Sequence, residues 1–276
     1  MIVSYREAWS LPRQFTQRRS VMWGLVGNAL ISIFIIPAFR IYGMIDFILE
    51  HLRGPNPQGP IDFNWHMVLL KRGFFLWLKV IVTALCWAYG TLLAVRWVVV
   101  VPLTLLTGSN FARESVDLVA ALLCVFGGGP MTMVAIARLF RTGSLDSVFQ
   151  VVPILRFTAR HYFQVLWCGL MFVWLSLVLY VCAYFTLGYF SGWAALAQAS
   201  LLAQLGRAAD AEFAPWHPDK WAVAALIAAL GLGVVAVICS IVVPYAARAQ
   251  DVVAVVVGIL LWRLGRPAQA AAGKAP

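Results

Sequence analysis

The sequence predicts an all-α fold: a polytopic integral membrane protein with about four transmembrane helices, an N-terminal re-entrant or interfacial hairpin and amphipathic interfacial helices. Composition is the first reason, because 62% of the 276 residues are hydrophobic, 12% are charged and the mean hydropathy is +0.86. Soluble domains carry about 25% charged residues. The second reason is a series of long apolar runs, and the third is that most basic residues flank these runs. This pattern is typical of helices that cross a bilayer.

Four apolar runs are long enough to cross a membrane. A helix rises about 1.5 Å per residue, so about 20 residues cross the ~30 Å hydrocarbon core. Lys79 and Arg96 fall inside the first run, near its two ends, from which long side chains reach the headgroups. The predicted spans are residues 74–106, 118–137, 162–190 and 221–247.

An earlier apolar segment, residues 21–39, has the length of a span but does not fit the distribution of charge. Cytoplasmic connections of membrane proteins are enriched in lysine and arginine. If this segment crosses with the N-terminus inside, twelve basic residues lie outside and seven inside; if it enters and leaves on one face, sixteen lie inside and three outside. Five crossings with the N-terminus outside give twelve inside and seven outside, and this scheme ranks second. We therefore expect residues 21–52 to form a re-entrant or interfacial hairpin that bends near Pro37.

The favoured scheme assigns a side of the membrane to every connection. It places the chain in the cell inner (plasma) membrane as one integral domain, residues 1–276, with both termini in the cytoplasm. Residues 1–20 are expected as a cytoplasmic interfacial segment, and residues 138–160 as a cytoplasmic loop with an amphipathic helix. Residues 191–220 are expected as an external loop that includes a stretch with helical spacing. The thirteen-residue apolar stretch 252–264 is too short to span and is expected as an interfacial or re-entrant helix.

The net charge of +10 points to the membrane surface. Basic residues next to apolar helices orient a membrane protein and bind anionic headgroups, so this charge does not indicate nucleic acid as a partner. The basic residues expected to contact anionic lipid lie before the first predicted span or follow the second, and they are Lys71, Arg72, Arg138, Arg141, Arg156 and Arg160.

The stretch FGGGPM interrupts the second predicted span at its midpoint. Three glycines weaken a helix, and the proline removes a backbone donor and disfavours helical geometry in the residue before it. In one interpretation, a discontinuous helix uses its freed carbonyl groups to line a binding site or a polar path. In the other, which we favour, the glycines let a second helix approach closely. The residues concerned are Gly127, Gly128, Gly129 and Pro130.

Catalytic and metal-binding patterns are not predicted in this chain. No Asp or Glu lies deep in the four predicted spans, which argues against ion-coupled transport. The four histidines lack metal-ligand spacing, the five cysteines form no CxxC pair, and no GxSxG, HExxH or Walker-type phosphate-binding sequence occurs. We expect no catalytic residue, no metal and no cofactor. Weaker alternatives are ligation of a pigment or haem metal in a larger complex and a lipid-modifying site built from Asn64, His66 and Arg138.

Four stretches in order along the chain read PAFRIYGM, IDFNWHMVLLKRGFF, PMTMVAIARLFRTGSLDSVFQVVPILRF and VVPYAARAQ. In these stretches the chain resembles an uncharacterised family of prokaryotic polytopic membrane proteins, the one labelled domain of unknown function 4013. The resemblance implies an all-helical integral membrane protein with cytoplasmic interfacial segments. It implies no activity and no catalytic residues, because the family carries no established activity.

These observations favour a non-enzymatic integral membrane subunit that assembles with other membrane proteins or organises lipid. The alternative is a channel or facilitative carrier built around the helix break at Gly127–Pro130. The expected partners are membrane lipids and either other integral membrane proteins or further copies of the chain.

Overall fold

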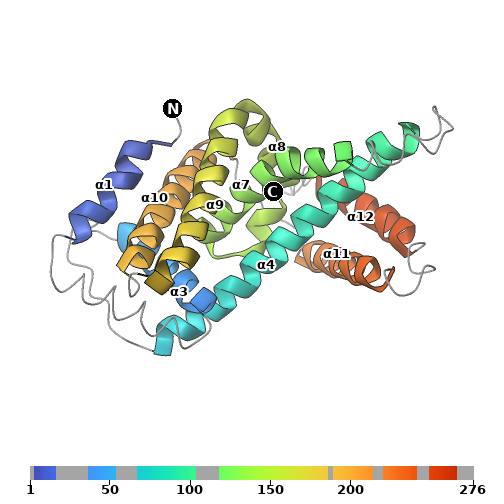
Figure 1. The fold of residues 1–276 in the computed structure, drawn as a ribbon. Helices are drawn as coiled ribbons and strands as arrows, with labels where there is room; N and C mark the ends of the chain where they lie inside the picture. The colour runs from blue at the N-terminus through green and yellow to red at the C-terminus, as the bar shows by residue number, and fades with distance from the viewer. Residues whose placement is uncertain are drawn as a thin grey trace, which may run out of the picture. The chain divides into compact units, whose positions relative to one another are not determined.

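The structure is a computed structural model that describes residues 3–16, 37–53, 67–103, 118–185, 189–213, 220–240 and 249–265. Every regular element in these ranges is a helix, so the all-α prediction is confirmed for the described residues (Figure 1). The elements are α1 (Tyr5–Thr16), α3 (Pro37–Arg53), α4 (Met67–Val95), η1 (Arg96–Val100), η2 (Cys124–Gly128), α7 (Gly129–Thr142), η3 (Leu145–Phe149), α8 (Val151–Arg160), α9 (Tyr162–Phe185), α10 (Tyr189–Glu212), α11 (Lys220–Ser240) and α12 (Ala249–Gly265).

Three stretches of described helix are long and apolar enough to cross a membrane, and they match three of the predicted spans. They cover Lys71–Leu103 (33 residues), Leu118–Thr142 (25 residues) and Lys220–Val237 (18 residues). The fourth predicted span, residues 162–190, contains α9, whose described apolar part is shorter. Three helices of spanning length are therefore shown, and the fourth crossing stays a prediction.

The predicted hairpin at residues 21–52 is described only from Pro37 onward. From this residue α3 runs as one continuous helix, and a proline at the first helical position loses no helical hydrogen bond. Residues 21–36 lie outside the described residues, as do Asn64 and His66 of the alternative lipid-modifying site. The hairpin and its bend therefore stay predictions.

The chain divides into two compact units, which are described separately. The first contains α1, α3, the start of α4, the end of α7, α9 and nearly all of α10, and comprises Met1–Ile81, Ile136–Gly143 and His161–Ala211. The second contains the remainder of α4 and α7 with η3, α8, α11 and α12, and comprises Val82–Ala135, Ser144–Arg160 and Glu212–Pro276.

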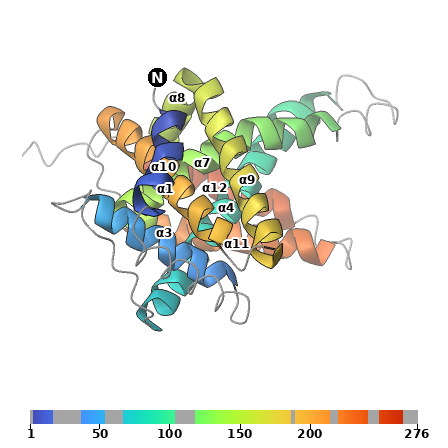
Figure 2. The ribbon, with the colours of Figure 1, turned by 60° about the vertical axis from the view of Figure 1, so that its left-hand side comes forward.

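The central helix of the first unit is α10, which lies between α1 and α9 (Figures 1 and 2). All the side chains from Ala194 to Leu202 are buried, including the polar Gln198 and Ser200. The sequence predicts an external loop at residues 191–220, whereas the structure has a 24-residue helix over most of this range. The polar residues of α10 lower its mean hydropathy, so the helix does not resemble a span in the sequence. In the structure these residues face other parts of the protein.

Polar side chains of α10 bind the elements on both of its sides. Gln198 Nε2 donates to the carbonyl oxygen of Phe172 (3.2 Å) and to Ser176 Oγ (2.8 Å), both on α9. Gln204 Oε1 accepts a hydrogen bond from the backbone N–H of Ser4 (2.5 Å), and Gln204 Nε2 donates to the Ser4 carbonyl (3.3 Å). A buried polar side chain is costly unless it is hydrogen-bonded. Gln198 and Gln204 meet this need by binding α9 and the residue before α1, so they fix α10 against both.

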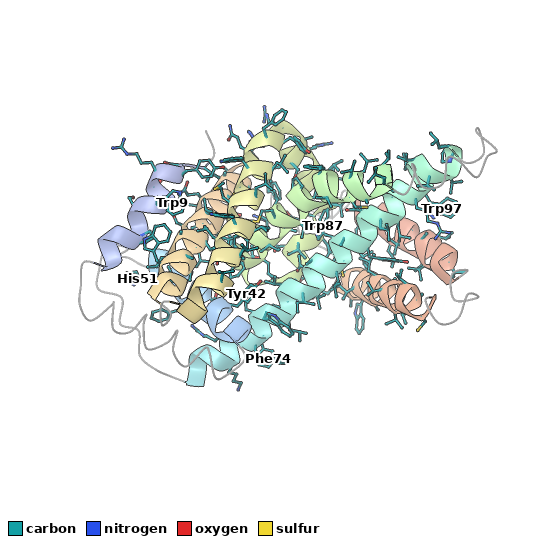
Figure 3. All side chains as sticks on the ribbon, viewed as in Figure 1. Trp9, Tyr42, His51, Phe74, Trp87 and Trp97 are labelled. Carbon is teal, nitrogen blue, oxygen red and sulfur yellow. The ribbon has the colours of Figure 1, made fainter. Side chains whose placement is uncertain are left out.

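The second unit packs its elements against the part of α4 that carries Trp87 and Trp97 (Figure 3). Trp87 Nε1 donates to the carbonyl oxygen of Val148 (3.0 Å), which ties η3 to the middle of α4. Gly233 of α11 faces Tyr89 so closely that an added Cβ would overlap the phenol ring. α11 packs beside α12, and α8 contacts α12. These contacts surround the cavity described below.

Candidate functional site

The helix does not break at the glycine stretch but changes its winding there. η2 is a π-helical turn that ends at Gly128, and α7 begins directly at Gly129, whose backbone is in the right-handed helical region (φ −56°, ψ −53°). A π-turn inserts one extra residue into a helix and occurs often at functional sites. The predicted irregularity is therefore present, in the form of a continuous helix with a local bulge.

Close packing against α4 explains why a glycine is required at position 128, one of the three glycines in the stretch. A Cβ added to Gly128 would lie 2.8 Å from Thr91 Oγ1 and 2.9 Å from Thr91 Cγ2, whereas nothing lies within 4 Å of a Cβ added to Gly127 or Gly129. Thr91 Oγ1 donates to the carbonyl oxygen of Trp87 (2.7 Å), which fixes the side chain that fills this space. Gly128 thus lets α4 approach closely, in agreement with the packing interpretation.

This contact predicts opposite outcomes for two neighbouring substitutions. Gly128→Leu forces its side chain into Thr91 and should lower stability by about 1–3 kcal/mol, the usual cost of overpacking, whereas Gly127→Leu points into open space and should not. Thermal unfolding of the two purified variants in the same detergent measures the difference. Equal melting temperatures would contradict a packing role for Gly128.

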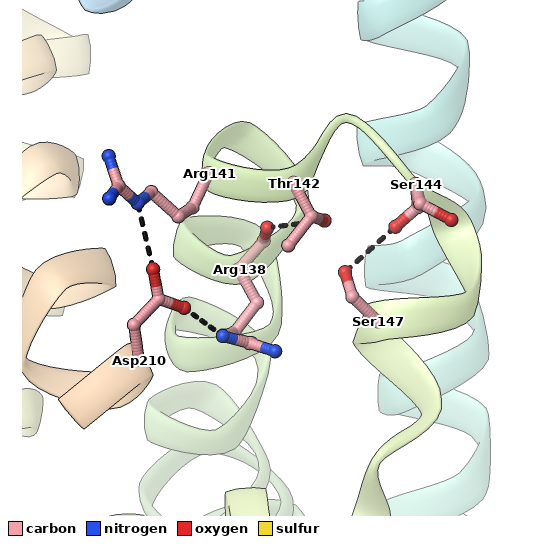
Figure 4. Close-up of polar contacts among 6 residues, drawn as sticks. All are labelled: Arg138, Arg141, Thr142, Ser144, Ser147 and Asp210. Carbon is pink, nitrogen blue, oxygen red and sulfur yellow. Dashed lines mark hydrogen bonds and ion pairs between the residues drawn. The ribbon is translucent and has the colours of Figure 1, made fainter. Parts of the chain in front are cut away.

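Two of the predicted lipid-binding arginines meet on one carboxylate of the first unit (Figure 4). The guanidinium of Arg138 donates to Asp210 Oδ1, and Arg141 Nε donates to Asp210 Oδ2 at 2.7 Å. The side chain of Arg138 is only 9% exposed, against 38% for Arg141 and 31% for Asp210. Two cations on one anion leave a local charge of +1, and Arg138 is committed to a protein partner.

The close approach of α7 and α10 makes this cluster possible. A Cβ added to Gly206 would lie 3.2 Å from the carbonyl oxygen of Ala137, so α10 reaches the backbone of α7 one turn before Asp210. Arg138 and Arg141 are three positions apart and therefore lie on the same face of α7. The sequence gives no sign that Asp210 is their partner, because 72 residues separate it from Arg138.

The cluster also bears on the predicted sides of the membrane. The charge scheme places residues 138–160 inside and residues 191–220 outside. Arg138 and Asp210 cannot form an ion pair across a bilayer, since their side chains are in direct contact. The contact favours one side for both Arg138 and Asp210, whereas the charge scheme assigns them to opposite sides.

The other predicted lipid contacts are divided between the two units. Lys71 and Arg72 are exposed at the start of α4, and Arg72 Nη1 lies 2.7 Å from Glu50 Oε2 of α3. Arg156 and Arg160 are exposed on α8 in the second unit, and Arg160 Nη1 lies 3.7 Å from Glu212 Oε2. Ion pairs between exposed side chains contribute little to stability. Because the four basic side chains are themselves exposed, they are accessible to anionic groups.

Lys79 has a partner that the sequence did not indicate. Its Nζ donates to the carbonyl oxygen of Gly143 (2.7 Å), the residue that ends α7 with a φ of +69°. A left-handed glycine is a common end of a helix, and a cation there complements the negative end of the helix dipole. Lys79 therefore fixes α4 to the end of α7 within the first unit.

Tyr5 lies at the start of α1, outside the predicted spans, and its hydroxyl has a shifted pKa. Burial, with a smaller contribution from Cys168, raises the pKa of the Tyr5 hydroxyl to about 12. The phenol therefore stays neutral over the physiological range. Within the described ranges, no group of three or more His, Cys, Asp or Glu side chains is placed to hold a metal ion.

A cavity of about 190 Å³ lies inside the second unit. It is half open and is lined by side chains from α4, α7, η3, α8, α11 and α12, among them Trp87, Met131, Leu155, Leu226 and Leu261. None of the residues in Gly127–Pro130 lines it. The side chains around the cavity are almost all apolar, so the site suits a hydrocarbon group.

The described fold defines the class of the protein: an all-helical protein with three helices of membrane-spanning length and apolarity. No family model matches the chain, and no curated protein or solved structure matches it either.

Proposed function

We propose that the chain is a non-enzymatic integral membrane subunit that organises lipid and assembles with other membrane proteins. The observation that carries this proposal is that polar and apolar side chains occupy different places in the fold. Polar groups within the helical packing bind other parts of the protein, while large apolar side chains cover much of the outside. Such an exterior is stable only against lipid or against another apolar protein surface.

The exposed apolar residues lie on several helices. Phe163 and Trp221 are 82% and 84% exposed at the starts of α9 and α11, where aromatic rings suit the headgroup zone. Farther along the chain, η1, α9, α11 and α12 expose Val98, Val173, Leu232 and Val252 respectively. Because monomeric soluble proteins rarely expose so much apolar surface, these faces support contact with lipid chains or neighbouring membrane proteins.

The same proposal includes a revised topology in which α10 crosses the membrane. Asp210 and Lys220 then join residues 138–160 in the cytoplasm, and α12 returns the C-terminus to that side. Apart from Lys79 and Arg96 within the first span, seventeen of the remaining nineteen lysines and arginines lie inside, and Arg113 and Arg248 lie outside. This distribution agrees with the rule of basic cytoplasmic connections better than the scheme drawn from sequence. Location in the inner membrane with cytoplasmic termini is part of this proposal.

The experiment is extraction of the tagged full-length protein in a mild detergent after crosslinking in cells. We expect a species larger than the monomer, with either a second membrane protein or tightly held phospholipid identified by mass spectrometry. Repeating the extraction with Asp210→Ala serves as a control for loss of fold. A protein that is always monomeric and free of lipid would overturn the proposal. The channel alternative is less well supported, because Gly128 has a packing role and the described cavity does not reach Gly127–Pro130.

A further inference from the structure

The cavity of the second unit adjoins a further hollow of about 280 Å³ between α12 and the end of α4 with η1. Cys86 and Trp87 line only the first hollow, whereas Trp97 and Ala254 line only the second (Figure 3). The residues that line both are Gly90, Ala94, Val257 and Leu261. The spanning stretch Lys71–Leu103 has its midpoint at residue 87, and residues 86 to 97 rise about 16 Å. The two hollows therefore extend from the middle of the span through about one half of the ~30 Å hydrocarbon core.

Two glycines leave space in these hollows that no described side chain fills. Gly90 lines both hollows and Gly258 lines the second, and no described atom lies within 4 Å of a Cβ added to either residue. At Gly233 the corresponding space is filled by the ring of Tyr89. Glycine weakens a helix, and in membrane proteins it commonly lets another group come close. The space at Gly90 and Gly258 is therefore available to a group from outside the described chain.

The lining of the hollows favours hydrocarbon. Among the described residues that line either hollow, none is charged. The hydroxyl of Thr91 and the indole N–H of Trp87 already donate to the backbone carbonyl oxygens of Trp87 and Val148. Water needs two to four polar partners in a buried site, and an apolar cavity of about 150 Å³ stays dry. A void also lacks the dispersion contacts that a hydrocarbon chain restores.

The size and the position of the hollows favour one lipid chain over a partner helix. A helix with its side chains is about 10 Å across and rises about 5.4 Å per turn, so one turn fills about 400 Å³, more than either hollow. The second hollow continues onto an exposed apolar surface, where Val255 is 60% and Trp97 43% exposed. The proposed function assigns such surface to lipid. The lining of the first hollow includes the buried Cys86 and Leu226, so a chain that enters beside Trp97 reaches the interior of the unit.

We infer that the second unit binds one acyl chain of a membrane phospholipid, with the ester end of the chain beside Trp97 and its terminal methyl beside Cys86. This inference rests on the proposed lipid-organising function and names the bound part of the lipid and its site. In the proposed topology the Trp97 end of α4 lies on the outer side, so the lipid belongs to the outer leaflet. Because the described lining carries no charge, binding does not depend on the charge of the headgroup.

Photolabelling of the full-length protein in phosphatidylcholine nanodiscs tests the inference with two probes. Both probes are phosphatidylcholines with a diazirine on one acyl chain, beside the terminal methyl in the chain-end probe and beside the ester in the ester-end probe. We expect the chain-end probe to label Cys86 and Trp87, and the ester-end probe to label Trp97, Ala254 and Val255. Phosphatidylglycerols that carry the same diazirines should give the same two patterns. Mass spectrometry of peptides locates the adducts.

Gly90→Leu should block the passage between the two hollows. The added side chain begins in open space, so it enters the hollow without displacing a described side chain. Labelling of Cys86 and Trp87 by the chain-end probe should be lost, because the leucine takes the place of the acyl chain. Labelling of Trp97 by the ester-end probe should persist. Gly258→Leu fills the second hollow instead and should reduce labelling by both probes.

The matched control is Gly231→Leu on α11, which also points into open space but lines neither hollow. Its labelling by both probes should equal that of the wild type. None of the three leucine variants should melt at a lower temperature than the wild type. A lower melting temperature of both Gly90→Leu and Gly258→Leu would show that protein side chains already occupy the hollows, which would contradict the inference.

The inference is also overturned if adducts spread evenly over the exposed faces of α4 and α12, if the two probes label in the reverse order, or if Gly90→Leu labels like the wild type. Its failure is distinguishable from that of the proposed function. Lipid that co-purifies with a protein labelled evenly would remove the acyl-chain site alone. Labelling confined to the hollows, in a protein that purifies as a monomer without lipid, would remove the proposed function and leave an exchangeable acyl-chain site.

Discussion

Replacement of Asp210 by alanine should destabilise the protein by about 3 kcal/mol, since removing one partner of a buried ion pair leaves its partner charge uncompensated. Arg138 is the partner concerned, and its side chain is 9% exposed. Chemical or thermal unfolding in detergent measures the loss. Asp210 is itself 31% exposed, and for this reason we expect the lower end of the usual range for such pairs.

Two further variants make this result interpretable. Glu7→Gln removes a carboxylate whose Oε1 lies 4.0 Å from Arg207 Nη2, with both side chains 60% exposed, and should change stability by less than about 0.5 kcal/mol. The double variant Arg138→Met with Asp210→Ala should recover much of the loss, because an apolar pair of similar volume replaces the buried charges. A single Asp210→Ala variant as stable as Glu7→Gln would show that the cluster does not hold α7 to α10.

The second prediction concerns the side of the membrane on which two segments lie, and the expected difference in labelling is nearly all-or-none. In a background without the five native cysteines, Asp146→Cys and Ala211→Cys should behave alike: a membrane-impermeant maleimide labels neither in intact cells and both after permeabilisation. The reason is the ion pair of Arg138 and Arg141 with Asp210, which needs these three residues on one side of the membrane. Position 146 follows Arg141 by five residues, and position 211 follows Asp210 directly. The probe positions are exposed or half-exposed and lie outside the cluster.

A cysteine at Ser109 provides the control. This position belongs to the connection that the proposed topology puts outside, so it should react in intact cells. Reaction at position 211 together with protection at position 146 would restore the scheme drawn from charge alone and remove the proposed crossing by α10.

Long apolar helices were predictable because their signal is local. The stretches at Lys71–Leu103, Leu118–Thr142 and Lys220–Val237 combine length with low charge, and both properties are visible in a short window of sequence. The glycine stretch at residues 127–129 was also visible as an irregular point. The sequence did not show whether the helix would contain a π-turn or a full break, because the same glycine-rich composition is compatible with both.

The remaining features depend on contacts between distant residues. α10 contains buried Gln198 and Gln204, which lower its hydropathy, and only their partners on α9 and at Ser4 explain why they are tolerated. The cluster on Asp210 joins residues 72 positions apart. The cavity is lined by six helical elements, α4, α7, η3, α8, α11 and α12. Their register is set by tertiary contacts such as that of Trp87 with Val148, so no local sequence pattern predicts the cavity.

The covered position of α10 has a consequence for biosynthesis. A helix with glutamines, an arginine and acidic residues partitions poorly from the translocon into lipid by itself. Its neighbours α1, α7 and α9 all precede it in the chain, so they have left the ribosome when α10 emerges. In the proposed topology, co-translational insertion of α10 depends on neighbouring helices that are already in place, and truncations that remove α1 should leave α10 outside the bilayer.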